Sequence, residues 1–194
     1  MDRREALKRT AWIMGGAISA PALIGIMKGC KARPTIDWKP AFLSEEQGLL
    51  VSQVSDIIIP KTDTPGAKEA GVPGFIDQLL NEVYSKEDQE KFLNGLKEFN
   101  DAATKQYGDP FVELDAAKQL EFVTAQHDAA VKAQKETKPA PPRPFILNLK
   151  ELTMLGFFTS QPGATQVLQY EPVPGAYKGC IPLSEAGNGR TWAT

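Results

Sequence analysis

The sequence predicts an all-α fold, a small helical domain of about five or six helices with an extended tail rich in proline and glycine. Three observations support this. Apolar residues recur at intervals of three and four through most of the chain. Capping residues and prolines stand at the ends of these segments. No alternation of apolar and polar residues lasts long enough to indicate a strand.

Four segments follow one another along the 194 residues. Residues 1–29 are expected to form an export signal, residues 30–43 a tether, residues 44–170 the helical domain and residues 171–194 the tail. This length suits one domain with a processed leader, and it is too short for a nucleotide-binding domain plus a substrate domain. The net charge of −2 excludes a global basic field for nucleic acid. One histidine and two cysteines exclude most metal sites built from nitrogen and sulfur ligands.

The leader begins with the adjacent residues Arg3 and Arg4, followed by an uncharged and weakly apolar run, Thr10–Met27. This pattern resembles a twin-arginine export signal, although Ala6 stands where Phe or Leu is usual and Leu7 comes one place later. The alternatives are a retained transmembrane anchor and a buried helix. A spanning helix needs about 20 strongly apolar residues, and this run is shorter and contains glycine and proline.

Cys30 follows Gly29 just after the apolar run, as in a bacterial lipoprotein cleavage site, although Lys28 is atypical. Cys30 would then carry the lipid that tethers the mature chain, and the alternative is an ordinary cysteine. The leader carries +3, which leaves −5 for the rest of the chain, and a basic leader on an acidic body fits export. If Cys30 is acylated, Cys180 is either a buried thiol or bonded to another subunit, and a buried thiol is expected.

The first two helices are marked by their ends. Ser44 and Gln47 form a capping box, and Pro60 ends the first helix because it disfavours helical geometry in the residue before it. Residues 61–72 form a loop, and Pro73 suits the first position of the next helix. The apolar face of that second helix is expected to comprise Phe75, Ile76, Leu79, Leu80 and Val83.

Two longer helices are expected next. Ser85 opens the third helix and Gly108 stops it, while Asp115 caps the fourth. The third helix should bury one stripe, Phe92, Leu96, Phe99 and Ala103, and the fourth should bury Leu120, Val123 and Ala130. Residues 135–144 are proline-rich and favour extended geometry. They form either a surface loop or a segment that lies along a partner.

The fifth helix, residues 145–159, is apolar on most sides, so it is either central or at an interface. A short sixth helix is expected over residues 163–170. The tail keeps aliphatic and aromatic residues that need burial, including Tyr177 and Trp192. It must therefore pack on the helices of this chain or on another protein.

Residues that could carry chemistry are few. The loop at Asp63, Pro65 and Gly66 suits an Asx-type turn followed by a tight turn. It is either a helix connection or a rigid contact loop, and with Tyr177 and Trp192 it supplies the candidate partner contacts. His127 stands alone on a helix, which is more typical of a surface residue than of a catalyst. No glycine-rich phosphate loop is present, so no catalytic, cofactor-binding or metal-binding residue is expected.

Three blocks occur in order: IIIPKTDTPGAKEAGVPGFIDQLL at 57–80, LGFFTSQPGA at 155–164 and YEPVPGAYKGCIPL at 170–183. Together they resemble the gluconate 2-dehydrogenase subunit 3 family. The resemblance implies a non-catalytic small subunit of a membrane-associated, periplasmic complex. Its large partner would be an FAD-dependent dehydrogenase of the glucose–methanol–choline class that oxidises sugars, sugar acids or glycosides. Complexes of this family often include a third, cytochrome subunit that carries haem c. This chain would hold no cofactor and would aid export, maturation and stability of the flavoprotein.

Two other hypotheses remain open from the residues. The chain could be a free-standing helical lipoprotein that binds a ligand or a component of the cell envelope. It could also be an enzyme with Asp63 and His127 among its few candidates. A stable monomer would favour the first of these, and turnover without a partner would favour the second.

Overall fold

The structure, a computed structural model, describes residues 35–138, 142–170, 175–176, 179–185 and 189–193. These residues fold as an all-α domain, as predicted, and no strand longer than an isolated bridge occurs among them. The helices belong to one unit that begins at Ile36. Arg3, Arg4, Cys30 and Tyr177 lie outside the described residues, so the expectations placed on them stay predictions.

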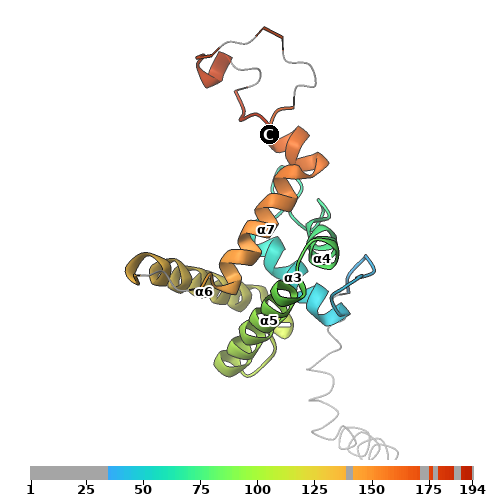
Figure 1. Cartoon of the computed structure of the whole chain (residues 1–194), viewed down its shortest axis with the longest axis vertical. Coiled ribbons are helices and arrows are strands. Elements are labelled where there is room, and N and C mark those ends of the chain that lie inside the picture. The colour runs from blue at the N-terminus through green and yellow to red at the C-terminus, as the bar shows by residue number, and fades with distance from the viewer. Residues whose placement is uncertain (1–34, 139–141, 171–174, 177–178, 186–188, 194) are drawn as a thin grey trace, which may run out of the picture. The chain divides into compact units, whose positions relative to one another are not determined.

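The first described helices, α3 (Glu45–Ile58) and α4 (Val72–Glu82), begin much as the sequence indicates (Figure 1). The capping box is complete. The backbone N–H of Gln47 donates to the Ser44 hydroxyl, and the backbone N–H of Ser44 donates to the side-chain carbonyl of Gln47. Pro73 is the second residue of α4 rather than its first. The expectation for Val83 is wrong: its side chain is 69% exposed because α4 ends at Glu82 and Val83 caps it.

Helices α5 (Lys86–Tyr107) and α6 (Ala116–Glu136) are capped by Ser85 and Asp115, as predicted. The expected stripe of α5 is buried along its whole length. In α6, Val123 and Ala130 are buried, but the prediction for Leu120 is wrong, since that side chain is 55% exposed. Phe122 is fully buried instead. Two residues along a helix turn the side chain by about 200°, so burying Phe122 directs Leu120 outward.

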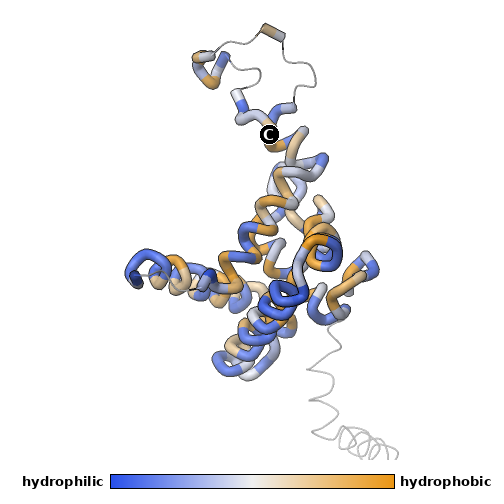
Figure 2. The backbone as a smooth tube through the Cα atoms, viewed as in Figure 1, coloured by the Kyte–Doolittle hydropathy of each residue, from blue (hydrophilic) through white to orange (hydrophobic). Residues whose placement is uncertain are grey.

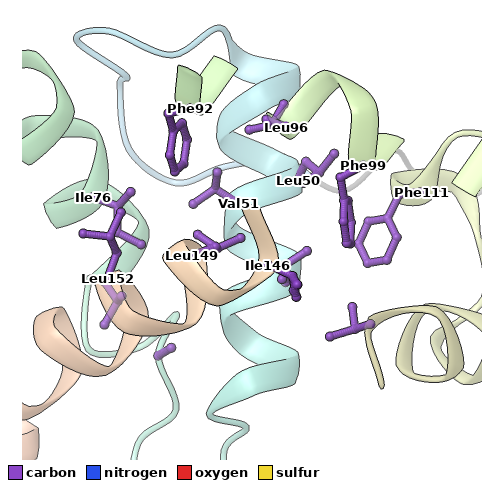
Figure 3. Packing of buried hydrophobic residues seen from close by; sticks show 14 of the residues in the cluster. Leu50, Val51, Ile76, Phe92, Leu96, Phe99, Phe111, Ile146, Leu149 and Leu152 are labelled. Atoms are coloured by element: carbon purple, nitrogen blue, oxygen red, sulfur yellow. The ribbon is translucent and has the colours of Figure 1, made fainter. Parts of the chain in front are cut away.

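Helix α7 (Phe145–Thr159) is the central element of the domain, and its predicted bounds are confirmed. It contacts α3, α4, α5 and α6. In Figure 3, labelled side chains of α3, α4, α5 and α7 converge in the core. Two glycines let helices approach α7 closely. A Cβ on Gly156 would lie 2.7 Å from the ring of Phe75 of α4, and one on Gly95 of α5 would lie 2.8 Å from the Phe145 Cβ.

An aromatic cluster fills the core between α5, α6 and the start of α7. The Phe99 ring centroid lies 4.9 Å from that of Phe122, 5.3 Å from that of Phe111 and 5.7 Å from that of Phe145. Phe111 belongs to a single 3-10 turn between α5 and α6 (Phe111–Glu113). The Phe99–Phe122 pair is edge-to-face and the other two are tilted. Aromatic pairs at such distances add to the free energy of burial, so this cluster fixes how α5 and α6 pack.

Polar groups also hold the interior. The buried Asp77 carboxylate of α4 accepts three backbone N–H bonds, from Ala41 at 2.6 Å, Phe42 at 3.1 Å and Leu43 at 2.7 Å. This cluster, here called the Asp77 clamp, ties the segment before α3 to α4. Elsewhere the buried Thr153 hydroxyl of α7 donates to the Leu149 carbonyl and lies 3.2 Å from the Ser55 hydroxyl of α3.

After α7 the chain forms a short π-helical turn, Gly163–Val167, where a short sixth helix was expected. The tail is then held at its base. The Gln169 amide donates to the Thr191 carbonyl, the Ala193 amide donates to the Gln169 carbonyl, and the Arg190 guanidinium donates to the Gln166 carbonyl. The expectation of a buried Cys180 thiol is wrong, because Cys180 is exposed. Its described neighbours, residues 179–185, are exposed too, so no helix covers that part of the tail.

Candidate functional site

Helix α7 carries two apolar faces, and the core covers only one of them. Its inner face is buried and consists of Ile146, Leu149, Leu152, Thr153, Gly156 and Phe157. Its outer face carries Leu147, Met154, Leu155 and Phe158, spaced so that they share one side of a helix. Met154 is 43% exposed, Leu155 47% and Phe158 36%. Figure 2 shows apolar colour along much of α7 and long hydrophilic stretches on α5.

This outer face forms one wall of an open groove of about 640 Å³, here called the α6–α7 groove. Its lining residues are His127, Val131, Arg143, Leu147, Lys150, Glu151, Met154, Leu155, Phe158, Thr159 and Leu168. Leu168 is at the base of the tail, so the groove runs from α6 along α7 to that base. Apolar side chains therefore meet a small number of charged ones in a single concave surface.

The polar residues of the groove are paired in a definite way. Lys150 Nζ lies 3.0 Å from His127 Nε2, and Asp128 Oδ1 lies 3.1 Å from His127 Nδ1. An ammonium group only donates, so Nε2 accepts from Lys150 and Nδ1–H donates to Asp128. Arg143 and Glu151 form an ion pair of 2.8 Å. Burial, and then the charges of Glu151 and Asp88, raise the pKa of the nearby Tyr84 phenol.

This arrangement does not favour catalysis by His127. With Nε2 accepting from Lys150 and Nδ1–H donating to Asp128, neither ring nitrogen is open to a substrate proton. Asp63 is in the loop between α3 and α4 and shares no described contact with His127. The described residues include no group of three or more His, Cys, Asp or Glu side chains that could hold a metal ion.

The loop between α3 and α4 is stiff, and Asp63 is exposed in it. The Ala67 amide donates to the Ile59 carbonyl at 2.8 Å, which closes the loop at its base. Gly66 is buried, and a Cβ there would lie 2.6 Å from the Lys61 amide nitrogen, so only glycine fits. The Lys61 ammonium binds Glu69 and, chiefly through that hydrogen bond, lowers the pKa of the Glu69 carboxyl. Pro65 is half-buried.

Large apolar side chains are also exposed in the described tail. Tyr170 is 63% exposed, Ile181 40%, Leu183 55% and Trp192 43%. Trp192 is at the closed base of the tail, paired with Gln169. The structure thus brings the base of the tail next to the α6–α7 groove through Leu168. The Asp63 loop leads into α4 at Val72, which lies beside Gly156 of α7, and none of its residues lines the groove.

Sequence reasoning missed two features. It placed residues 145–159 at the centre or at an interface because they are apolar on most sides. It did not single out Lys150 or separate an outer face with Met154, Leu155 and Phe158 from the inner face. It also missed Asp77, whose signal is a single carboxylate among the apolar residues of FIDQLL. That carboxylate lies on the buried side of α4 because backbone amides satisfy it there.

Comparisons with known proteins give one match, to a family model. No curated protein and no solved structure matches the chain. None of the described helices is both long enough and apolar enough to cross a membrane. A family model described as gluconate 2-dehydrogenase subunit 3 matches residues 45–175, from the start of α3 into the tail. That match covers more than half of the chain, so the protein belongs to the gluconate 2-dehydrogenase subunit 3 family and is an accessory subunit of a dehydrogenase complex.

Proposed function

We propose that this chain is the non-catalytic small subunit of a periplasmic, membrane-associated complex whose large subunit is an FAD-dependent sugar or glycoside dehydrogenase of the glucose–methanol–choline class. The chain aids export, maturation and stability of that flavoprotein. FAD is held by the large subunit, haem c by a third subunit where one is present, and no cofactor by this chain. The observation that carries the proposal is the family match over residues 45–175.

Two features of the chain support this role. The leader pairs Arg3 and Arg4 ahead of a weakly apolar run, and the twin-arginine route that such leaders address carries folded proteins. The described domain exposes apolar side chains along the outer face of α7 and in the tail. An exposed apolar patch rimmed by polar residues is typical of a surface that another protein covers.

Co-expression with the flavoprotein that we expect a neighbouring reading frame to encode tests the proposal. We expect the two chains to co-purify under mild detergent with a flavin absorbance spectrum. Without this chain, the flavoprotein should stay in the cytoplasm with little bound flavin. Export of active, flavin-loaded enzyme in the absence of this chain would overturn the role. A stable monomer that never binds the flavoprotein would instead favour a free-standing lipoprotein.

Export and tethering are tested at separate residues. Replacing Arg3 and Arg4 with lysine should leave both chains in the cytoplasm, because a twin-arginine route requires that pair. Cys30→Ala should block processing or release the chain from membranes, since acyl chains supply about 0.8 kcal/mol per buried CH₂. An intact chain that still contains Met1 in the membrane fraction would support an uncleaved anchor instead.

A further inference from the structure

We propose that the α6–α7 groove receives an amphipathic helix of the catalytic subunit that presents a carboxylate to Lys150. This inference rests on the proposed function, because it names how the large subunit is held. The sequence leaves helix α7 either central or at an interface, and we assign the contact to its outer face. The candidate contacts that the sequence did single out are the Asp63 loop, which does not line the groove, and the tail, whose base meets the groove at Leu168.

The dimensions of the groove suit a helix. Leu147 and Phe158 are eleven positions apart on α7, which corresponds to about 16 Å or three helical turns. The exposed side chains of Met154, Leu155 and Phe158 lie along this length, and Val131 of α6 faces them across the groove. An apolar groove between two packed helices is a surface on which a third, amphipathic helix can pack.

The charges in the groove specify the occupant. Arg143 is neutralised by Glu151 at 2.8 Å. Lys150 has no carboxylate partner among the described residues, and its hydrogen-bond partner there is the ring nitrogen of His127. Lys150 is therefore a positive charge in the groove that no described carboxylate balances directly. A carboxylate on the incoming helix would form a charge-assisted hydrogen bond with the Lys150 ammonium inside the groove, where less water surrounds the pair.

The openness of the groove favours a protein segment over a small amphiphile. Sites for small molecules usually bury about 70–90% of the ligand surface. Here Met154, Leu155 and Phe158 remain between 36% and 47% exposed, so the groove presents one long side rather than an enclosure. A helix that is itself part of a larger subunit would cover such a side, and its other faces would stay with its own domain.

Site-specific photo-crosslinking in the co-expressed complex tests this directly. A benzophenone amino acid replaces Leu155, and the control replaces Lys97, an exposed residue of α5 that does not line the groove. We expect Leu155 to crosslink to a single flavoprotein segment with apolar residues at helical spacing and at least one Asp or Glu, and Lys97 not to crosslink there. A complex that forms without any crosslink from position 155, or an adduct of lipid mass, would overturn the inference while the proposed function stands.

Matched substitutions supply the second measurement. Lys150→Glu should weaken capture of the flavoprotein at least tenfold, as charge reversal at an interface centre does, while Lys150→Arg and the surface control Lys97→Glu should not. Leu155→Asp should do the same, and Val83→Asp, which is 69% exposed outside the groove, should not. Equal loss in groove and control variants with an unchanged helical circular dichroism spectrum would overturn the inference. If the unsubstituted chain also captures no flavoprotein, that result contradicts the proposed function itself and not only the role of the groove.

Discussion

Helices α5 and α7 differ in how their apolar residues are used. Helix α5 is longer, and its buried apolar side chains form a single stripe with charged residues elsewhere. Helix α7 is shorter and apolar on two sides, of which the core covers one. A stripe of one helical face needs one covering surface. The outer face of α7 therefore indicates that another surface, one outside the described domain, covers it. The apolar stripe of α5, in contrast, is covered by the core.

The largest expected effect comes from breaking the α5 stripe. Phe99→Ala removes the ring that touches three other phenylalanines, and should lower the free energy of unfolding by about 3–5 kcal/mol. Urea denaturation followed by circular dichroism measures it. Phe158→Ala on the outer face of α7 is the matched control and should cost less than about 1 kcal/mol. Equal losses would show that the two faces do not differ.

A smaller effect is expected on the inner face of α7. Thr153→Val leaves the buried Ser55 hydroxyl without the partner it has at 3.2 Å, which should cost about 1–3 kcal/mol. Replacing both residues, Ser55→Ala with Thr153→Val, should cost less than the sum of the single changes, because no polar group is then left unpaired. Additive losses in thermal denaturation would contradict a shared hydrogen bond.

The outer face of α7 should show almost no stability effect in the isolated subunit. Leu155→Asp places a carboxylate on a side chain that is 47% exposed, so the free energy of unfolding should change by about 0.5 kcal/mol or less. The midpoint of urea denaturation checks this with the partner absent. A loss above about 2 kcal/mol would mean that the residue supports the fold itself, and the contrast with α5 would disappear.

The smallest effect concerns Tyr84, whose phenol is influenced by Asp88 of α5 and Glu151 of α7. Burial first, and these two charges next, raise its pKa. The folded state thus favours the neutral phenol, and its contribution to stability is present below about pH 10 and lost as the pH rises through the raised pKa. Tyr84→Phe should make the fall in stability above about pH 10 shallower. An unchanged pH profile in chemical denaturation would contradict this assignment.

The sequence predicted what local chemistry determines. Caps at Ser44, Ser85 and Asp115 and the stripe of α5 follow from hydrogen bonding and periodicity within one segment. Leu120 could not be placed in this way, because the choice between it and Phe122 depends on which side of α6 meets the aromatic cluster.

Features that depend on contacts between segments far apart in the chain could not be predicted from the sequence. The role of Asp77 depends on amides more than thirty positions earlier in the chain, and no pattern within α4 reveals those partners. Cys180 was expected in a core because free cysteine is usually buried, but burial requires an element that covers the tail, and the described tail residues around it are exposed. The second face of α7 was visible as excess apolarity, yet its groove required the position of α6.

The Asp77 clamp also helps to shorten the tether of the domain. It holds residues 41–43 on α4, and ahead of it the Trp38 ring packs beside Gly48 of α3 and Gly74 of α4. If Cys30 carries the lipid as proposed, Ile36, where the folded unit begins, is six positions after that anchor, and at about 3.3–3.6 Å per residue this stretch spans roughly 20 Å. The segment before α3 would then keep the domain within that distance of the bilayer surface.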